Sequence, residues 1–185
     1  MAGATEGGLT IRSARLEDSA QIAMIYAHHV RHGTATFDTE PPPADHWGGK
    51  IESVQAHGWP FLVAEAEGAL FAFAYAAQFR DRPAFCHCCE DSIYVRIDRL
   101  GHGIGTALLA ALIEAARASG FTQMLAIIGD AEPASVALHA RLGFRHAGRM
   151  DNVGYKFGRW LDIVCMQRTL VAPDKEDPHE SDHLA

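Results

Sequence analysis

The stretch from Arg99 to Gly120, RLGHGIGTALLAALIEAARASG, constrains the fold of this 185-residue chain more than any other segment. Three glycines alternate directly before a sequence that is patterned like an amphipathic helix. The apolar stripe of that helix consists of Ile104, Leu108, Leu112 and Ala115. Bare backbone in front of a helix presents N–H groups and the positive end of the helix dipole to a bound anion. The segment therefore predicts a loop and a helix N-terminus suited to a pyrophosphate.

Two common phosphate-binding motifs do not match this segment. A Walker loop ends in Lys and Ser/Thr, whereas GHGIG is followed by Thr106 and Ala107. A dinucleotide fingerprint needs a glycine where Thr106 stands and an acidic residue about 20 positions on, where Gly120 and Phe121 lie. The sequence therefore disfavours both nucleoside triphosphates and NAD.

The rest of the chain alternates between strand and helix patterns. Apolar periodicity predicts strands at 9–14, 90–95, 121–129 and 162–170, a hairpin at 60–79 folded about Glu67 and Gly68, and helices at about 17–30, 44–56, after the three glycines, and between Pro133 and Gly143. A hairpin followed by alternating strands and helices indicates a mixed α/β sheet flanked by helices. We expect a single domain over residues 1–170.

Charge and hydropathy exclude several classes of partner. The net charge is −7, and residues 171–185 carry about −4 of it, so that segment is expected to be a disordered acidic tail. The remaining chain has no basic cluster, which disfavours nucleic acid. No apolar run approaches the roughly 20 residues of a membrane span. The first residues, MAGATEGGL, show no export signal, so a cytoplasmic location is expected.

Three of the four cysteines lie in the sequence CHCC, residues 86–89. On a strand, adjacent side chains point to opposite faces and cannot jointly surround one tetrahedral metal ion. We therefore expect thiols beside a cleft and no metal site, with a metal-binding protein as a minor alternative.

Several motifs in order resemble one enzyme family. EDSIYVRIDRLGHGIGTALL resembles the strand, pyrophosphate loop and helix of the GNAT superfamily of acyl-CoA-dependent N-acetyltransferases, and PASVALHARLGF resembles the cofactor-side helix that follows. Across about residues 10–170 the chain is similar to the phosphinothricin and methionine sulfoximine acetyltransferase branch, in TATFDTEP, AYAAQFR, CEDSIYV and GYKFGRWLD. The resemblance implies a mostly antiparallel central sheet flanked by helices, whose splayed central strands form an acetyl-CoA cleft.

The same resemblance implies where the cosubstrate acetyl-CoA lies. Its pantetheine arm would pair with the backbone of residues 93–95, and its pyrophosphate would lie in the loop 100–106. The implied cofactor-binding residues are Ile93, Tyr94, Val95, Leu100, Gly101, His102, Gly103, Ile104, Gly105, Thr106, Glu132 and Ser135. Leu100 replaces the Gln or Arg of the family pattern and Glu132 replaces an Asn, so weaker acetyl-CoA binding is expected.

Acetyl transfer to an amine requires a base, because an α-amino group with a pKa near ~8 is mostly protonated at neutral pH. Glu90 and Asp91 are adjacent and face opposite ways on a strand, so at most one is expected to point into the cleft. Their spacing does not choose between them, and the resemblance selects Glu90. His139 lies one helical turn after Ser135, and the resemblance gives it a proton-donor or base-assisting role. A strand amide near Ile93 would stabilise the oxyanion.

The acceptor implied by the resemblance is a small amino acid with a free carboxylate. The matching substrate positions are Phe37, Arg80, Arg82, Phe85 and Ser92, and a homodimer is typical of the branch. Two alternatives remain. The chain could be a non-catalytic acyl-CoA sensor, or it could acetylate a protein N-terminus or a polyamine.

Overall fold

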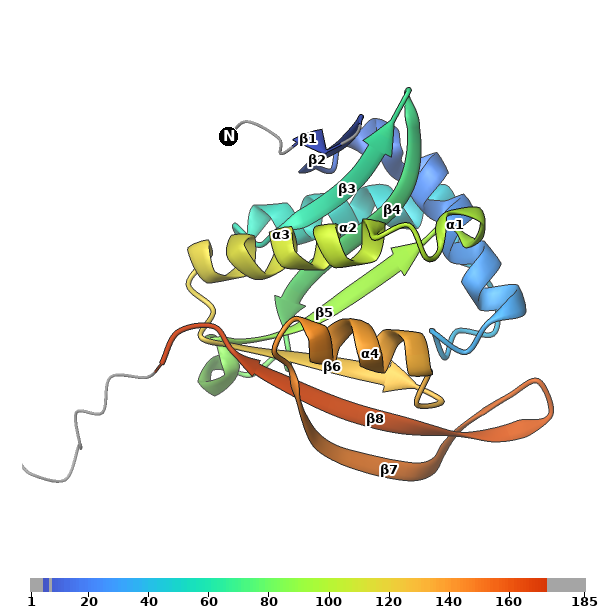
Figure 1. Ribbon diagram of the computed structural model, residues 1–185, viewed down its shortest axis with the longest axis vertical. Helices are drawn as coiled ribbons and strands as arrows, with labels where there is room; N and C mark the ends of the chain where they lie inside the picture. Colours follow the sequence, from blue (N-terminus) through green and yellow to red (C-terminus); the bar gives the residue numbers. More distant parts are fainter. Residues whose placement is uncertain (1–4, 7, 173–185) are drawn as a thin grey trace, which may run out of the picture.

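The computed structural model describes residues 5–6 and 8–172, which form one mixed eight-stranded sheet with helices on both faces (Figure 1). Most of the predicted acidic tail, residues 173–185, lies outside the described residues. In chain order the elements are β1 (Thr5–Glu6), β2 (Leu9–Ser13), η1 (Leu16–Asp18), α1 (Ser19–His32), α2 (Ala44–Ala56), β3 (Phe61–Ala66), β4 (Ala69–Gln78), η2 (Pro83–Phe85), β5 (Cys88–Val95), η3 (Ile97–Arg99), α3 (Ile104–Ala118), β6 (Gln123–Gly129), α4 (Pro133–Arg141), β7 (Arg145–Lys156) and β8 (Arg159–Thr169). The strand order is β1-β2-β3-β4-β5-β6-β8-β7.

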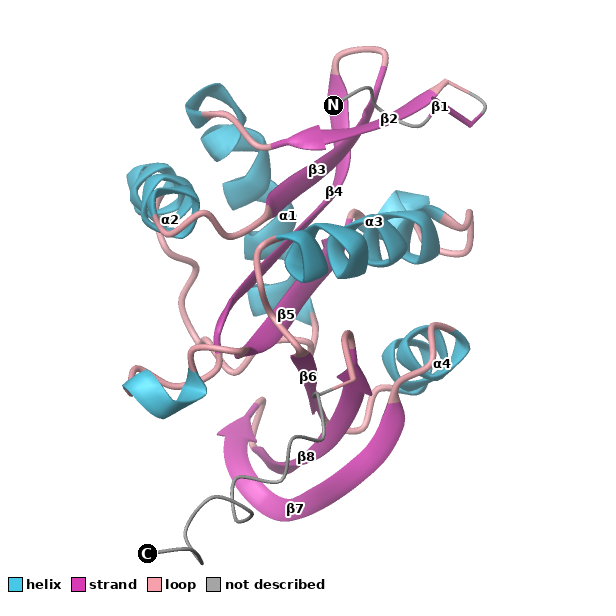
Figure 2. Cartoon of the chain, turned by 90° about the vertical axis from the view of Figure 1, so that its left-hand side faces the viewer, coloured by secondary structure: helices cyan, strands magenta, loops and turns pink. Residues whose placement is uncertain are grey.

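Helices α1 and α2 cover one face of the sheet, and α3 and α4 cover the other (Figure 2). The alternation along β4 explains this arrangement. The small side chains of Ala72, Ala74 and Ala76 pack on the α3 side, while Phe73 packs among the side chains of α1 and α2. Small residues under α3 let that helix lie close to the sheet, and this fixes the position of its N-terminus.

The central strands β5 and β6 separate along their length, as the sequence resemblance implied (Figure 1). They are parallel and pair from Cys88–Gln123 to Asp91–Ala126. Beyond that point β5 remains paired with β4 as far as Val95, and β6 remains paired with β8 as far as Gly129. The backbone edges of residues 92–95 and 127–129 that face each other therefore have no strand partner within the described chain, although the Val95 carbonyl oxygen lies 2.8 Å from His29 Nε2.

Most of the predicted elements are confirmed, and two differences are informative. Strand β7 was not predicted, because it is exposed along nearly all its length and has no apolar alternation to detect. The strand predicted at 90–95 begins two residues earlier, at Cys88, and Cys89 within it is fully buried. No helix among the described residues combines the length and the apolarity that a membrane crossing needs.

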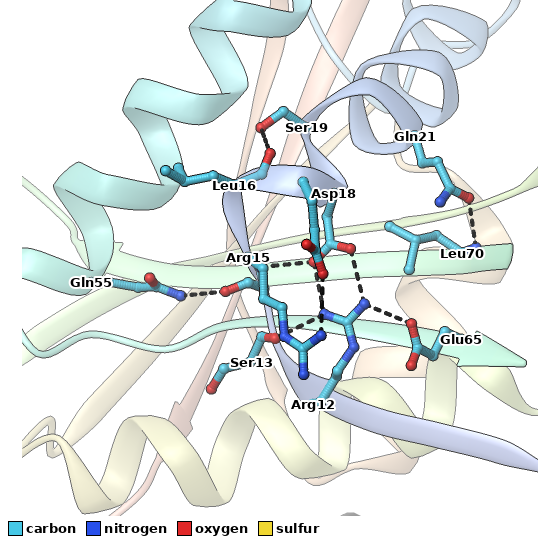
Figure 3. Close-up of polar contacts among 12 residues, drawn as sticks. Arg12, Ser13, Arg15, Leu16, Asp18, Ser19, Gln21, Gln55, Glu65 and Leu70 are labelled. Atoms are coloured by element: carbon cyan, nitrogen blue, oxygen red, sulfur yellow. Dashed lines mark hydrogen bonds and ion pairs between the residues drawn. The ribbon is translucent and has the colours of Figure 1, made fainter. Parts of the chain in front are cut away.

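A buried ion pair fastens the start of α1 to the edge of the sheet (Figure 3). Both guanidinium Nη atoms of Arg12 in β2 donate to Asp18, at 2.7 and 2.9 Å, and Nη2 also donates to Glu65 of β3 at 2.6 Å. The Arg15 N–H donates to the same Asp18 carboxylate at 2.7 Å. The side chain of Asp18 is only 4% exposed, so Arg12 neutralises a charge that has almost no access to water.

Candidate active site

Two pockets adjoin each other where β5 and β6 separate. The smaller, about 180 Å³, contains Glu90, Asp91 and His139, and the larger, about 440 Å³, lies against the N-terminus of α3. Four residues line both pockets: Ala35, Ile93, Glu132 and Ser135. The shared lining makes them parts of one cleft, in which a molecule bound at α3 can reach the carboxylates.

The larger pocket has the backbone geometry of an anion site. Gly101 and Gly103 both adopt φ of 77°, a left-handed conformation that side chains disfavour. The Ala107 N–H donates to the Gly103 carbonyl at 3.0 Å. The N–H groups of residues 104–106, in the first turn of α3, therefore have no helical acceptor and are available to a ligand.

Two arginines that the sequence analysis missed also line the larger pocket. They are Arg99 at the end of η3 and Arg141 at the end of α4. The Arg99 Nε is buried and makes no hydrogen bond within the described chain. Cations beside free amides suit a pyrophosphate, and the unpaired edge of β5 suits an amide-containing arm. The residues present therefore fit acetyl-CoA. Arg99 directly precedes the glycine loop, and this position is the sequence feature that could have identified it as a residue of the anion site.

Most of the predicted cofactor residues lie together. Lining the larger pocket are Ile93, Val95, Leu100, Gly101, Gly103, Ile104, Gly105, Thr106, Glu132 and Ser135. Two do not join them: Tyr94 lines the smaller pocket, and the exposed His102 lines neither. The Glu132 carboxylate accepts hydrogen bonds from the Ala134 and Ser135 N–H groups, at 3.2 and 2.6 Å, and so caps α4.

Glu90 and Asp91 face opposite sides of the sheet, yet both line the smaller pocket. This differs from the expectation that at most one would reach the cleft. The reason is that the pocket lies at the gap between two strands, which is accessible from both faces. Burial and the neighbouring Asp91 charge raise the pKa of Glu90, while the charges of Arg80 and Lys50 oppose the rise. A carboxylate with a raised pKa is a better proton acceptor for an ammonium group.

His139 is buried at the base of the same pocket. Its Nε2 lies 3.1 Å from Asp91 Oδ2, and its Nδ1 lies 2.7 Å from the carbonyl oxygen of Ser135. The ring of Phe144 packs edge-on against the imidazole, with ring centroids 4.9 Å apart. These contacts hold the ring in one orientation.

The loop between α1 and α2 forms a wall of the cleft through Ala35 and Phe37. The buried Lys156 Nζ donates to the carbonyl oxygens of Gly33 and Thr36, at 2.9 and 2.8 Å. The Phe37 ring occupies the space beside Gly154, where an added Cβ would lie 2.2 Å from the ring. The loop that follows α1 is therefore fastened to β7 by Lys156 and by the packing of Phe37 on Gly154.

Only some of the residues predicted to bind the acceptor substrate line the smaller pocket. Ser92 lines the smaller pocket, as Phe37 does, but Arg80, Arg82 and Phe85 do not. The two arginines are exposed in the loop after β4, where the Gln78 side chain donates to both of their carbonyl oxygens. Of these three, Arg80 is the one whose charge acts on Glu90.

The cysteine-rich segment passes beside this loop. Cys86 is exposed, Cys88 is half-buried and Cys89 is buried, and all the cysteines of the chain are free thiols. Within residues 5–6 and 8–172, no group of three or more His, Cys, Asp or Glu side chains is arranged to hold a metal ion.

Comparisons with known proteins agree with this geometry. Residues 11–165 match the model of the acetyltransferase (GNAT) domain. A phosphinothricin N-acetyltransferase of Alcaligenes faecalis is 44% identical over 91% of this chain and 86% of its own length. An L-methionine sulfoximine/L-methionine sulfone acetyltransferase of Pseudomonas aeruginosa is 40% identical over 87% of this chain and 94% of its own. The crystal structure of a phosphinothricin acetyltransferase from Sinorhizobium meliloti in complex with AcCoA superimposes with a TM-score of 0.88, at 41% identity, covering 94% of this chain and 95% of that one.

Proposed function

Because the chain belongs to the GNAT acetyltransferase family and is an N-acetyltransferase that uses acetyl-CoA, we propose that its acceptor is the α-amino group of a small amino acid analogue. The analogue is of the phosphinothricin, methionine sulfoximine or methionine sulfone type, and transfer occurs directly in a ternary complex. One observation carries the proposal: the pocket that holds Glu90 adjoins the anion site at α3 and is small, about 180 Å³.

In this reaction acetyl-CoA supplies the acetyl group as an activated thioester. Glu90, whose pKa is raised mainly by burial, takes a proton from the acceptor ammonium, directly or through water. The unpaired backbone of residues 92–95 offers an N–H to the oxyanion. His139 lies on the opposite face of β5 from Glu90 and supplies the proton that the departing thiolate requires. The second proton, which the acceptor nitrogen loses as the amide forms, restores the proton of His139.

The experiment that tests the proposal is a thiol-release assay with acetyl-CoA and a panel of amines. The panel contains phosphinothricin, methionine sulfoximine, methionine sulfone, a polyamine and a peptide with a free N-terminus. We expect turnover with the three amino acid analogues and a loss of about 100-fold or more in Glu90→Gln. Turnover confined to the peptide or the polyamine would contradict the proposed acceptor, and acetyl-CoA binding without turnover would favour the sensor alternative. Acetylation of phosphinothricin would also make the protein a resistance factor.

We further propose that the protein is a cytoplasmic homodimer. Support for the location comes from its free cysteines, which suit a reducing compartment. Support for the dimer comes from the β7–β8 hairpin, which exposes five large apolar side chains: Met150, Val153, Tyr155, Phe157 and Trp160. We expect dimers in sedimentation experiments at micromolar concentration and a shift toward monomer in Trp160→Glu. A monomeric unmodified protein would contradict the dimer.

A further inference from the structure

The hydrogen-bond partners of His139 determine which of its nitrogens carry protons. A carbonyl oxygen can only accept, so the Nδ1 atom, 2.7 Å from the Ser135 carbonyl, must carry a hydrogen. If the ring were neutral, Nε2 would then present a lone pair to the Asp91 carboxylate 3.1 Å away. Two buried acceptors at that distance repel each other. A second proton must therefore lie between Nε2 and Asp91.

The surroundings of Asp91 lead to the same conclusion. Its side chain and that of His139 are each only 2% exposed. Its other oxygen, Oδ1, is buried and has no hydrogen-bond partner in the described chain, where its one ion pair is with His139. A buried carboxylate without other donors needs either its own proton or a cation beside it. A protonated His139 is the cation beside Asp91, and it also donates the hydrogen bond that the carboxylate needs.

Among the described residues that line the smaller pocket, there is no lysine or arginine that could take over this role. The other titratable groups that line the pocket with the pair are Glu90 and Tyr94 of β5 and Glu132 at the start of α4. The Asp91 charge also raises the pKa of the Cys89 thiol and of Tyr75. Burial by itself would lower the pKa of His139, but the hydrogen bond and charge of Asp91, with a contribution from the Ser135 carbonyl, raise it above the ordinary value.

We propose that Asp91 is a positioning residue that keeps a proton on Nε2 of His139, so that the free protein presents an imidazolium at the base of the cleft. The pair then works as an acid and leaves Glu90 as the base. The protonation state is a property of the free chain. Its use in protonating the leaving thiolate rests on the proposed function.

The first test measures the protonation directly in the free protein. Proton–nitrogen correlation spectra of the histidine side chains are recorded against pH, with His139→Gln to assign the His139 signals among the eleven histidines. We expect both ring nitrogens of His139 to be protonated at pH 7. In Asp91→Asn the side-chain amide can donate to Nε2, so His139 should be neutral at pH 7. Asp98→Asn, which removes an exposed carboxylate from η3, is the matched control and should leave the His139 titration unchanged.

The inference is overturned if His139 of the unmodified protein is neutral at pH 7, or if Asp91→Asn leaves its titration unchanged. Because Asp91 is buried, each variant is first checked for a cooperative melt. Asp91→Ser replaces the carboxylate with a smaller side chain that cannot hold an imidazolium, and it should give the same loss of protonation if Asp91→Asn folds poorly.

The second test uses turnover and distinguishes a proton effect from a structural one. In Asp91→Asn we expect kcat to fall about 100-fold with little change in the KM for acetyl-CoA. The alkaline limb of the kcat profile should move to lower pH, because His139 loses its proton more easily. The acid limb set by Glu90 should also move to lower pH, because the Asp91 charge that helps to raise the pKa of Glu90 is removed. A fall in kcat without movement of the alkaline limb would overturn the role of the pair. If no acceptor is turned over at all, the proposed function fails, and the spectra still decide the protonation of His139.

Discussion

At the scale of single residues, the charges around Glu90 should control the pH at which the protein works. Lys50 and Arg80 both oppose the rise in its pKa, and both were missed as partners of this carboxylate by the sequence analysis. Lys50 is half-buried beside the Tyr75 ring, with Nζ 4.9 Å from the ring centroid. Neither position follows from sequence spacing, because α2 and the loop after β4 meet β5 only in the folded sheet.

We predict that Lys50→Gln or Arg80→Gln moves the acid limb of kcat/KM to higher pH. Glu90 must be ionised to act as a base, so activity falls as the pH drops through its pKa, and removing a nearby cation raises that pKa further. The measurement is a pH–rate profile for each variant. Arg117→Gln, which removes an exposed cation from α3, should leave the limb in place. An acid limb that stays where it is in both Lys50→Gln and Arg80→Gln would show that Glu90 does not set it.

At the scale of elements, the attachment of the loop 33–38 to β7 should determine the shape of the acceptor pocket. This attachment could not be predicted from the sequence. Strand β7 has no apolar alternation, and the two glycines against which Phe37 packs, Gly129 and Gly154, carry no side chain to indicate a contact. By contrast, the helix after the glycine loop was predictable, because its apolar stripe and its glycines are local signals.

We predict that Gly154→Ala raises the KM for the acceptor about tenfold while leaving the KM for acetyl-CoA and the melting temperature almost unchanged. The added methyl group would lie 2.2 Å from the Phe37 ring, which is partly exposed and can move away from the cleft wall. Gly148→Ala, on the same strand with nothing within 4 Å of its added Cβ, is the matched control. Equal kinetic constants in the two variants would exclude Phe37 as a determinant of acceptor binding.

At the scale of the whole molecule, stability depends on the buried network around Arg12. The sequence pattern predicted the strand at 9–14, but it did not predict that Arg12 in this strand is an ion-pair partner and not a solvated side chain. Only the folded structure brings Asp18 and Glu65 to Arg12 (Figure 3). Burial would raise the pKa of Asp18, but the hydrogen bonds from Arg12 and from the Arg15 N–H outweigh it and lower the pKa.

We predict that Arg12→Met lowers the free energy of unfolding by about 2–3 kcal/mol, because it leaves the Asp18 carboxylate buried without its cation. Arg15→Met, which removes an ion pair to Glu17 that is mostly exposed, should change it by less than about 0.5 kcal/mol. Urea unfolding at pH 7 measures both values. Similar losses in the two variants would contradict the role given to the buried pair.

The same network should make the protein sensitive to acid. The pKa of Asp18 is lower in the folded than in the unfolded chain. Its contribution to the free energy of unfolding is therefore complete above the unfolded pKa of about 3.9 and is lost as the pH falls through the folded pKa. In Asp18→Asn the loss of stability on acidification should be smaller than in the unmodified protein.

The opening between β5 and β6 gives the sheet an internal edge in addition to its two outer ones. Unpaired strand edges at the rim of a protein are aggregation hazards, because any extended chain can add to them. This edge is recessed between two halves of the sheet, and residues of α3 and α4 line the cleft in front of it, which leaves little room for a strand of a neighbouring protein. A single slender molecule with its own amide groups meets no such obstacle. Backbone N–H and C=O groups without a strand partner, which would promote aggregation at an outer edge of the sheet, can thus bind a ligand selectively at its centre.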